Sequence, residues 1–459
     1  MTIRQNIVLG ILILIVIRGV SLSSLPFLDT TEARYAEISR IMVETQNWTT
    51  PQFDYNVPFW GKPPLYTWAS AAFVKLFGNS ELALRLPHFL VSILSIFLVA
   101  FFAKKVRINP ITTAFILMSS LGFFMASGMV MTEALLTFSM IASMVGFYLG
   151  WFAQRSWAYL GFVGLGLGLL AKGPIILVLV GLAIFIWLVA NYGLIQGFRE
   201  LFRRLPFISG MGVTLFVALP WYLAAELATP GFIDYFIIGE HWSRFTTSGW
   251  EGDLYGTAHD EPRGMIWVYW IAVAFPWSFI FFYHLFKRQK STWFAFKAFN
   301  KEKPLTSFLL IWACVPMILF TFAGNILPIY VMPGIPAFAL LFAKCVEFTS
   351  KRLIAIGLVV PIALFCVLVT APNLIEHRTD KWLLENTETS TPIYYFSGIS
   401  FSGRYYSNGT AKVYEPNNHP DAFYLVIEKH FVKELLNDNA GCIEKARNKR
   451  KLLFKCNVS

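Results

Sequence analysis

The stretch from Ile7 to Leu25, IVLGILILIVIRGVSLSSL, determines the fold class of this protein because it is apolar except for Arg18 and a few serines. Apolar runs of 18 residues or more are typical of transmembrane helices. Of the 459 residues, 56% are hydrophobic and 14% are charged, against about 45–50% and about 25% in an average soluble protein. This composition excludes an ordinary soluble enzyme, a disordered chain and a disulfide-rich scaffold. The first run has no small-residue cleavage site, so we predict a retained span and not a removed signal.

Similar runs recur along most of the chain and predict an all-α polytopic membrane protein. At roughly 20 residues per span, we expect about eleven spans. They are 7–25, 83–103, 111–128, 134–153, 157–170, 174–190, 207–226, 265–286, 306–323, 329–344 and 353–371.

The positions of the cations predict the orientation of these spans. Lysine and arginine accumulate in cytoplasmic loops of membrane proteins. With eleven spans, the basic clusters all fall on one side, which we therefore predict to be cytoplasmic. They are Lys104–Arg107, Arg199–Arg204, Lys287–Lys303 and Lys351–Arg352. The net charge of +11 then reflects these loops and anionic membrane lipid, and no nucleic-acid partner is expected.

Two long segments, 26–82 and 227–264, fall on the opposite, external side. Loops of this length are usually functional. Apolar residues in Glu32–Thr45 recur at helical spacing, and Leu65–Phe77 has a similar pattern. We predict two amphipathic helices that lie on the membrane surface.

The tail from Pro372 changes composition abruptly and alternates short apolar and polar stretches. We predict strands at Pro392–Phe396, Lys412–Tyr414 and Phe423–Ile427, and helices at Ser402–Ser407 and Phe431–Leu436. The chain would then consist of a transmembrane domain, 1–371, and a small external α/β domain, 372–459. A domain of about 80 residues is marginally stable alone, so a disulfide between Cys442 and Cys456 would help it.

The densest group of ionisable residues opens the first external segment, with Asp29, Glu32 and Arg34 beside Tyr35. A carboxylate at the membrane surface could deprotonate an acceptor hydroxyl or hold a divalent cation against a phosphate. The structural alternative is the start of a helix, with Thr30 or Thr31 as the N-cap and Glu32 as an early acid.

A second group surrounds Lys62 in the sequence Trp60-Gly-Lys-Pro-Pro-Leu. Two prolines set the start of the next helix, and Lys62 lies just before it, where backbone N–H groups are free. An ammonium group next to exposed N–H groups can bind phosphate. The alternative is a turn whose lysine extends toward water.

Further charges lie at external ends of spans: Glu133, Lys172, and His241 with Arg244. A charge at membrane depth is costly and suggests a function. Arg85 could instead form an ion pair with Glu81, four residues earlier on the same helix. Since the acids and cations share one membrane face, we predict that they meet in one cavity, as in an enzyme that handles a lipid phosphate.

Four motifs occur in a fixed order along the chain: DTTEARYAEISR from Asp29, WGKPPLYTW from Trp60, ELALRLP from Glu81 and LLAKGP from Leu169. In this order they resemble the bacterial branch of the C-type (GT-C) glycosyltransferases. That branch includes the aminoarabinose transferases of lipid A and the protein mannosyltransferases. The small external tail domain also fits this family.

The resemblance implies a GT-C fold and a sugar donor carried on polyprenyl phosphate, most simply undecaprenyl phosphate. It implies transfer at the periplasmic face of the bacterial inner membrane to lipid A, another envelope glycolipid or a protein. Asp29 and Glu32 are the candidate catalytic carboxylates, and Lys62 would contact the donor phosphate. The residues expected to bind substrate are Arg34, Tyr35, Lys62, Arg85, Glu133, Lys172, His241 and Arg244. A divalent cation is possible, with Glu32, Glu133 and His241 as candidate ligands.

This chain differs from the aminoarabinose transferases at the first motif. Where they have Asp-Glu-Thr-Arg-Tyr, it has Thr31-Glu-Ala-Arg-Tyr, so either Asp29 or Glu32 would have to supply the carboxylate. The glutamate that precedes their Lys-Pro lysine is Gly61 here, which argues against a metal site that uses that glutamate.

Two later motifs differ as well. The acid after the third span, usually aspartate, is Glu133, and the Lys-Leu-Pro-Thr-Tyr pattern is Ile326-Leu-Pro-Ile-Tyr, without its lysine. These differences suggest another sugar or acceptor. A transporter or flippase of lipid-linked sugars is the rival class. Such proteins more often place ionisable groups near the bilayer midplane and contain two related halves, and we find neither pattern here.

Overall fold

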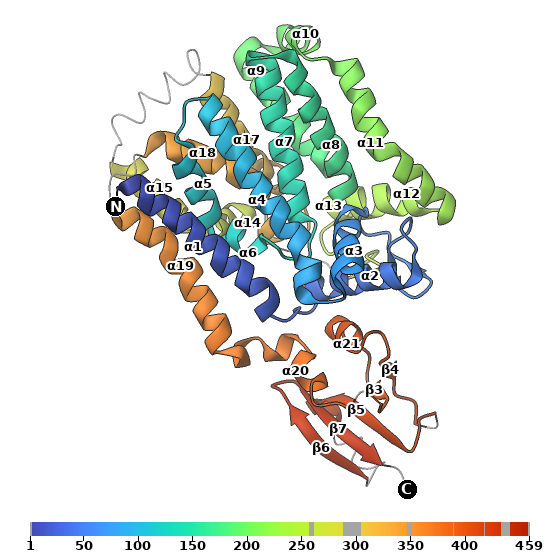
Figure 1. Cartoon of the computed structure of the whole chain (residues 1–459). Helices are drawn as coiled ribbons and strands as arrows, with labels where there is room; N and C mark the ends of the chain where they lie inside the picture. Colours follow the sequence, from blue (N-terminus) through green and yellow to red (C-terminus); the bar gives the residue numbers. More distant parts are fainter. Residues whose placement is uncertain are drawn as a thin grey trace.

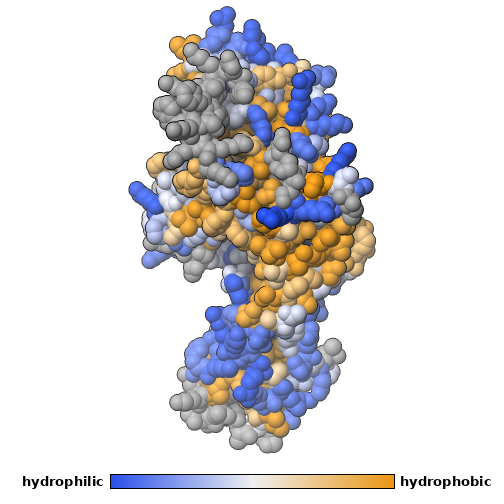
Figure 2. Space-filling model, turned by 90° about the vertical axis from the view of Figure 1, so that its left-hand side faces the viewer, coloured by the Kyte–Doolittle hydropathy of each residue, from blue (hydrophilic) through white to orange (hydrophobic). Residues whose placement is uncertain are grey.

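The computed structural model describes residues 2–256, 261–287, 304–346, 351–388, 390–416, 418–432 and 441–457. It has a large bundle of helices and, at the C-terminal end, a small domain built on a β-sheet (Figure 1). Figure 2 shows large hydrophobic areas on the helical part and a mostly hydrophilic surface on the small domain. The protein is a multi-pass membrane protein, as the apolar runs predict.

Seven helical segments in the described part of the chain are long and apolar enough to cross a membrane. The pair α14 (Met265–Val273) and α15 (Trp277–Lys287), bent by 105°, gives an eighth if counted as one span. The seven are α1 (Ile3–Ser24), α4 (Glu81–Lys105), α7 (Glu133–Phe152), α9 (Ile175–Tyr192), α11 (Phe207–Ala228), η3 with α18 (Pro328–Gly334, Ile335–Cys345) and α19 (Lys351–Thr370).

The number of long spans is lower than the predicted eleven, although helices occupy all eleven predicted positions. The run at 111–128 is broken at Ser120 into α5 (Pro110–Ser119) and α6 (Leu121–Ala126). Two further helices are short: α8 (Ala158–Lys172) and α17 (Pro304–Phe320). A separate helix, α10 (Leu194–Arg204), bears the whole basic cluster Arg199–Arg204. Residues 288–303, with most of another basic cluster, lie outside the described residues.

Helices α7 and α8 form a tightly packed antiparallel hairpin. A Cβ atom on Gly146 would lie 2.3 Å from the backbone nitrogen of Gly161. The two backbones therefore come into close contact at a point where both helices have a glycine. Small residues allow such close approach between membrane helices. Because the two helices run in opposite directions, the first residue of α7, Glu133, comes to lie beside the last residue of α8, Lys172.

The two helices predicted in the first external segment are present as α2 (Thr31–Thr45) and α3 (Leu65–Phe77). A two-stranded antiparallel ribbon, β1 (Gln52–Asp54) and β2 (Val57–Pro58), connects them. The amphipathic surface position predicted for α2 is wrong, because every residue from Glu32 to Met42 except Arg34 is buried. Helix α2 is therefore an internal element between α3 and the tail.

The tail contains a five-stranded sheet of order β4-β3-β5-β7-β6. Its strands are β3 (Ile393–Tyr395), β4 (Lys412–Val413), β5 (Ala422–Glu428), β6 (Cys442–Arg447) and β7 (Lys451–Asn457). Strand β3 pairs in parallel with β4 and β5, and β7 pairs antiparallel with β5 and β6. Two short helices, α20 (Lys381–Leu384) and α21 (Phe401–Tyr406), accompany the sheet.

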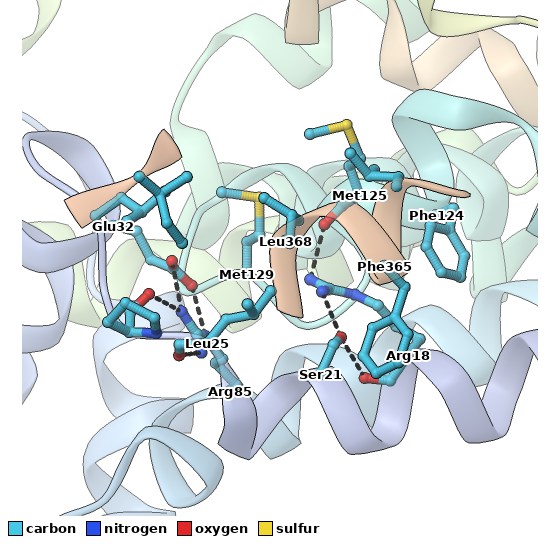
Figure 3. A pocket seen from close by; sticks show the side chains of 14 residues that line it. Arg18, Ser21, Leu25, Glu32, Arg85, Phe124, Met125, Met129, Phe365 and Leu368 are labelled. Atoms are coloured by element: carbon cyan, nitrogen blue, oxygen red, sulfur yellow. Dashed lines mark hydrogen bonds and ion pairs between the residues drawn. The ribbon is translucent and has the colours of Figure 1, made fainter. Parts of the chain in front are cut away.

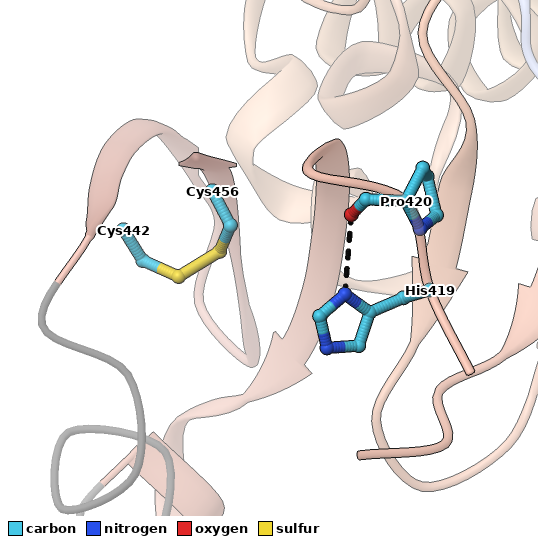
Figure 4. Close-up of a disulfide and its surroundings, with 4 residues drawn as sticks. All are labelled: His419, Pro420, Cys442 and Cys456. Carbon is cyan, nitrogen blue, oxygen red and sulfur yellow. Dashed lines mark hydrogen bonds between the residues drawn. A yellow bond between two sulfur atoms is a disulfide. The ribbon is translucent and has the colours of Figure 1, made fainter. Parts of the chain in front are cut away.

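The disulfide considered in the sequence analysis is present between Cys442 and Cys456 (Figure 4). These residues are direct partners across β6 and β7. The three strands predicted in the tail and the first of its helices are confirmed. The sequence analysis missed β6 and β7, and most of the helix predicted at Phe431–Leu436 lies outside the described residues.

Candidate functional site

Lys62 lies in a constrained turn between β2 and α3. The hydroxyl of Tyr255 accepts a hydrogen bond from the Trp60 backbone nitrogen at 3.0 Å and donates to the Pro58 carbonyl at 2.9 Å. The two prolines after Lys62 then start α3. The Lys62 ammonium group points toward Glu240 and donates to its carboxylate at 3.1 Å. This contact joins positions 178 residues apart in the sequence.

Lys172 reaches the same region from the end of α8. Its ammonium group contacts the carboxylate of Glu133 at 2.6 Å, and both side chains are almost fully buried. The nitrogen also lies 4.6 Å from the centre of the Tyr330 ring, within the range of a cation–π interaction. Tyr330 belongs to the short 3₁₀ helix η3, so residues from α7, α8 and η3 meet here.

Arg244 and Glu240 come from the second external segment. After α12 (Phe232–Asp234), the chain forms a π-helix, η2 (Tyr235–Ser243), which continues into α13 (Arg244–Thr246). π-helical turns are rare and frequent at functional sites. The Arg244 guanidinium contacts Glu240 at 3.2 Å and Asp253 at 3.0 Å. Glu240 therefore lies between two cations, Lys62 and Arg244.

These side chains line a small cavity of about 90 Å³, which we call the cationic pocket. Its residues are Lys62, Lys172, Ile175, Glu240, His241, Arg244, Phe245, Phe320, Asn325 and Tyr330. The three cations contact three carboxylates, those of Glu133, Glu240 and Asp253. Charges taken out of water require such partners. The cluster is thus close to neutral, and a bound anion would compete with these carboxylates.

The pKa values in the cationic pocket reflect both burial and the neighbouring charges. Burial alone would raise the pKa of Glu240, but the neighbouring charges of Lys62 and Arg244 outweigh this effect and hold the pKa below its ordinary value. Burial lowers the pKa of His241, although the contacts of its ring with two backbone carbonyls act in the opposite direction. Its ring nitrogens lie 2.8 Å from the Phe236 carbonyl and 3.2 Å from the Lys172 carbonyl.

Glu32 and Arg85 form a buried ion pair outside the cationic pocket (Figure 3). Arg85 Nε and Nη2 each donate to one oxygen of Glu32 at 2.8 Å. The same guanidinium donates to the carbonyls of Leu22 and Pro26 at 3.0 Å. The alternative pairing of Arg85 with Glu81 is wrong, because Glu81 contacts Lys381 of the tail at 2.7 Å.

Asp29 lies at the junction of the first external segment and the tail. Its carboxylate accepts hydrogen bonds from the backbone nitrogen of Ser402 at 2.9 Å and from the Ser402 hydroxyl. The Asp29 backbone nitrogen donates to the carbonyl of Arg378 at 2.7 Å. Burial raises the pKa of Asp29. Lys62, Lys172, His241 and Arg244 therefore share one cavity, as expected, and Glu133 contacts Lys172. The expectation is wrong for Asp29, Glu32 and Arg85.

Arg34 and Tyr35 occupy the space between these regions. Arg34 donates to the carbonyl of Tyr255, and its guanidinium carbon lies 5.8 Å from the ring of Phe401 in the tail. Tyr35 is buried, with its ring 4.6 Å from that of Tyr66. The catalytic and binding roles assigned to individual residues from the sequence stay predictions.

The candidate metal ligands Glu32, Glu133 and His241 do not form one site. Within the described ranges, no three His, Cys, Asp or Glu side chains are placed to share a cation. Glu32 is bound by Arg85 and Glu133 by Lys172. Gly61 also leaves no room for a carboxylate, because a Cβ atom there would lie 3.0–3.2 Å from the rings of Phe59 and Tyr255. The donor set does not fit a divalent cation held by these residues.

Sequence reasoning missed three residues of this region: Glu240, Asp253 and Tyr330. Tyr330 ends the Ile326–Tyr330 motif, which differs from the family pattern at its first residue and keeps its tyrosine. That retained tyrosine was an available signal. Glu240 adjoins His241, but nothing in the spacing shows that it faces Lys62.

The bundle, the external helices and the small sheet domain define the class of this protein: a multi-pass membrane protein with the GT-C fold. Residues 12–236 match the model of the dolichyl-phosphate-mannose-protein mannosyltransferase family. The crystal structure of ArnT from Cupriavidus metallidurans bound to undecaprenyl phosphate has the same fold. The TM-score is 0.76 at 19% identity, over 98% of this chain and 97% of that one.

Curated relatives are similar over most of this chain. An undecaprenyl phosphate-alpha-4-amino-4-deoxy-L-arabinose arabinosyl transferase of Enterobacter sp. (strain 638) is 29% identical over 68% of this chain and 54% of its own length. The enzyme of the same description from Erwinia tasmaniensis is 28% identical over 75% of this chain and 62% of its own length. The matched part of this chain thus spans less than two thirds of these relatives.

Proposed function

We propose that this protein is a glycosyltransferase that moves a sugar from an undecaprenyl-phosphate donor to lipid A or a related envelope glycolipid. One observation carries the proposal: Lys62, Lys172 and Arg244, from three distant parts of the chain, line one pocket with Tyr330. Relatives described as undecaprenyl-phosphate aminoarabinose transferases support this donor class. Because this chain differs from the motifs of the aminoarabinose transferases at Gly61 and Ile326, the identity of the sugar stays open.

In this proposal, the cationic pocket holds the donor phosphate. The leaving group is a polyprenyl phosphate, a stable anion that needs positive charge and no proton. Preorganised cations in a site shielded from water stabilise such developing charge strongly. Lys62 and Arg244 would exchange part of their contact with Glu240 for contact with the phosphate. Glycosidases differ, because they protonate the leaving oxygen with a carboxylic acid.

The acceptor determines whether a general base is needed. A phosphate group on the acceptor is already anionic and can attack the anomeric carbon directly, whereas a hydroxyl must lose a proton to a carboxylate. Glu32 is a poor candidate for this role, since both of its oxygens are bound by Arg85. A phosphate acceptor is therefore the simpler partner for this site, and single displacement would invert the anomeric centre.

We further propose that the pocket and the tail face the periplasm from the bacterial inner membrane. The basic clusters on the opposite side support this orientation. The Cys442–Cys456 disulfide supports it independently, because disulfides persist in the periplasm and are rare in the cytosol.

Transfer by purified protein tests the proposal. The wild type and Lys62→Met are incubated with a synthetic undecaprenyl-phosphate sugar and lipid A, and released undecaprenyl phosphate is quantified. We expect release by the wild type that depends on lipid A, and about a hundredfold loss in Lys62→Met, the size typical when one stabilising group is removed. Lys75→Met, an exposed lysine of α3, is the matched control and should retain activity.

The same assay separates an enzyme from a carrier. A transporter or flippase would move the donor between leaflets of a vesicle without releasing undecaprenyl phosphate. Binding of the donor without any acceptor-dependent release would contradict the proposed activity and favour the carrier.

A further inference from the structure

A groove between the tail and the first external segment is separate from the cationic pocket. It has a volume of about 1060 Å³, comparable to sites that bind drug-sized molecules. Its walls come from Asp29 and Thr30, from the short helix at Glu376–Arg378, and from the ends of strands β5 and β7. We call it the basic groove.

The basic groove contains more positive charge than its own acids neutralise. Arg378, Lys429, Lys449, Arg450 and Lys451 line it, together with the carboxyl groups of Asp29 and Glu428. Lys451 forms an ion pair with Asp380 at 2.7 Å. The other four cations form no ion pair with any carboxylate in the described ranges. This differs from the cationic pocket, where every cation contacts a carboxylate.

Three cations of the basic groove, Lys449, Arg450 and Lys451, lie at a turn whose backbone is held by hydrogen bonds. The side-chain oxygen of Asn448 accepts hydrogen bonds from the backbone nitrogens of Arg450 and Lys451 at 2.9 and 2.8 Å. Its amide nitrogen donates to the Glu376 carbonyl at 3.2 Å. His377 also lines the groove, and its Nδ1 atom is buried without a hydrogen-bond partner. Cations that mostly lack a carboxylate partner, on a backbone held in place, fit a polar anionic ligand.

An apolar cleft, shown in Figure 3, lies close to the basic groove along the chain. Leu28 and Ile375 line the cleft, and Asp29 and His377, respectively one and two residues further along the chain, line the groove. The cleft lies between α1, α6 and α19, and its other walls include Leu364, Phe365 and Leu368. Its volume of about 110 Å³ admits only the start of an acyl chain.

Beyond the cleft, the outer surfaces of α1 and α19 continue the apolar path. Val16, Val20 and Val367 are exposed there, at 62%, 49% and 46%. Inside the cleft, Arg18 donates to the carbonyl of Met125 and the hydroxyl of Ser21, both at 2.8 Å. It has no ion pair with a carboxylate among the described residues. The cleft thus has mostly apolar walls, with Arg18 and the Glu32–Arg85 ion pair among its lining residues, which suits the glycerol or sugar end of an acyl chain.

We propose that the basic groove binds the phosphorylated sugar headgroup of the acceptor glycolipid, with its acyl chains along α1 and α19. This inference rests on the proposed function, for which it places the acceptor apart from the donor. Arg34 lies between the two sites: it bonds to the Tyr255 carbonyl, and its guanidinium faces Phe401, which lines the groove. A protein acceptor would make no use of the apolar cleft, so the arrangement favours a glycolipid over a protein substrate.

The test compares two charge reversals of equal size in full-length protein reconstituted in nanodiscs. Lys429→Glu/Lys449→Glu changes two exposed lysines of the basic groove. Lys412→Glu/Lys445→Glu changes two exposed lysines on the edge strands β4 and β6, and it is the matched control. We measure binding of bis-phosphorylated lipid A, binding to phosphatidylglycerol vesicles, and the KM values for donor and acceptor.

We expect the groove variant to bind lipid A about tenfold more weakly and to raise the acceptor KM about tenfold, with the donor KM unchanged. The control variant should match the wild type in both. Equal losses in the two variants, or a loss restricted to phosphatidylglycerol vesicles, would show general attraction to an anionic membrane and overturn the inference. If the wild type transfers no sugar, the proposed function fails, while the lipid A binding measurement still decides whether the groove is a glycolipid site.

Discussion

The cationic pocket and the basic groove both gather cations on one face of the protein, but they neutralise them differently. In the pocket, Lys62, Lys172 and Arg244 are buried and each contacts a carboxylate. In the groove, Lys429 and Lys449 are exposed and have no such partner among the described residues. Buried charges must be compensated within the protein, whereas exposed ones are compensated by water and salt.

This difference suggests two ways of binding a phosphate. In the pocket, a phosphate must replace a carboxylate as the ion-pair partner of the cations, so binding is an exchange of partners. In the groove, the anion adds to free cations, and attraction depends strongly on ionic strength. We therefore expect pocket variants to change stability and catalysis together, and groove variants to change acceptor binding alone.

Removal of a buried pocket cation should have the largest effect. Lys172→Met leaves Glu133 buried without a partner, and loss of one member of a buried pair typically costs about 3–5 kcal/mol. We expect a clear fall in thermal stability in detergent and loss of transfer. Glu133→Gln/Lys172→Met removes both charges and should regain much of the stability without the activity. Recovery of activity in the double variant would show that Lys172 is structural only.

Disruption of the tail should affect the groove and spare the pocket. The Cys442–Cys456 disulfide joins β6 to β7, and the turn between these strands bears Lys449 and Arg450. A disulfide that closes a loop of about 15 residues contributes about 3 kcal/mol. In Cys442→Ser/Cys456→Ser we expect lower stability of the tail and weaker lipid A binding, with unchanged binding of undecaprenyl phosphate. An equal loss of both ligands would show that the two sites are not independent.

A variant of Glu240 tests whether a phosphate competes with this carboxylate for the cations of the pocket. Glu240→Gln removes the carboxylate that holds Lys62 and Arg244, so a phosphate no longer has a competitor for these cations. We expect undecaprenyl phosphate to bind about tenfold more tightly, a gain of about 1.4 kcal/mol, as measured by titration in detergent. Weaker binding would mean that Glu240 orients the cations and does not compete for them.

Much of this arrangement could be predicted from the sequence because the signals are local or periodic. Apolar runs gave the membrane fold, and the positions of the basic clusters placed Lys62, Lys172 and Arg244 on one face before any contact was known. The pairing partners could not be predicted in the same way. Glu32 meets Arg85 across 53 residues, and neither spacing nor charge distinguishes that pair from Arg85 with Glu81.

Two other features have physical reasons for being missed. The π-helix at Tyr235–Ser243 changes the angular spacing of its side chains, so an α-helical pattern does not indicate that Glu240 faces Lys62. Strand β6 alternates partly buried and exposed residues at the sheet edge, with Ile443 65% exposed. Such an edge strand lacks the apolar run that identified β5.

The smallest effect is expected at Asp29, which lies at the boundary of the basic groove. Burial raises the pKa of this carboxyl above its ordinary value of 3.8, so the folded protein binds the proton more tightly than the unfolded chain. Stability is therefore lost as the pH rises from 3.8 through the folded-state pKa. Asp29→Asn removes this cost and should be slightly more stable than the wild type near pH 7, but not at pH values below 3.8. Chemical unfolding across this pH range measures the difference. Transfer at saturating lipid A should remain near the wild-type level, because the Asp29 carboxylate is bound to Ser402 and lines the basic groove, not the cationic pocket. A fall in transfer of about a hundredfold without a change in stability, the effect of losing a general base, would instead identify Asp29 as the catalytic carboxylate.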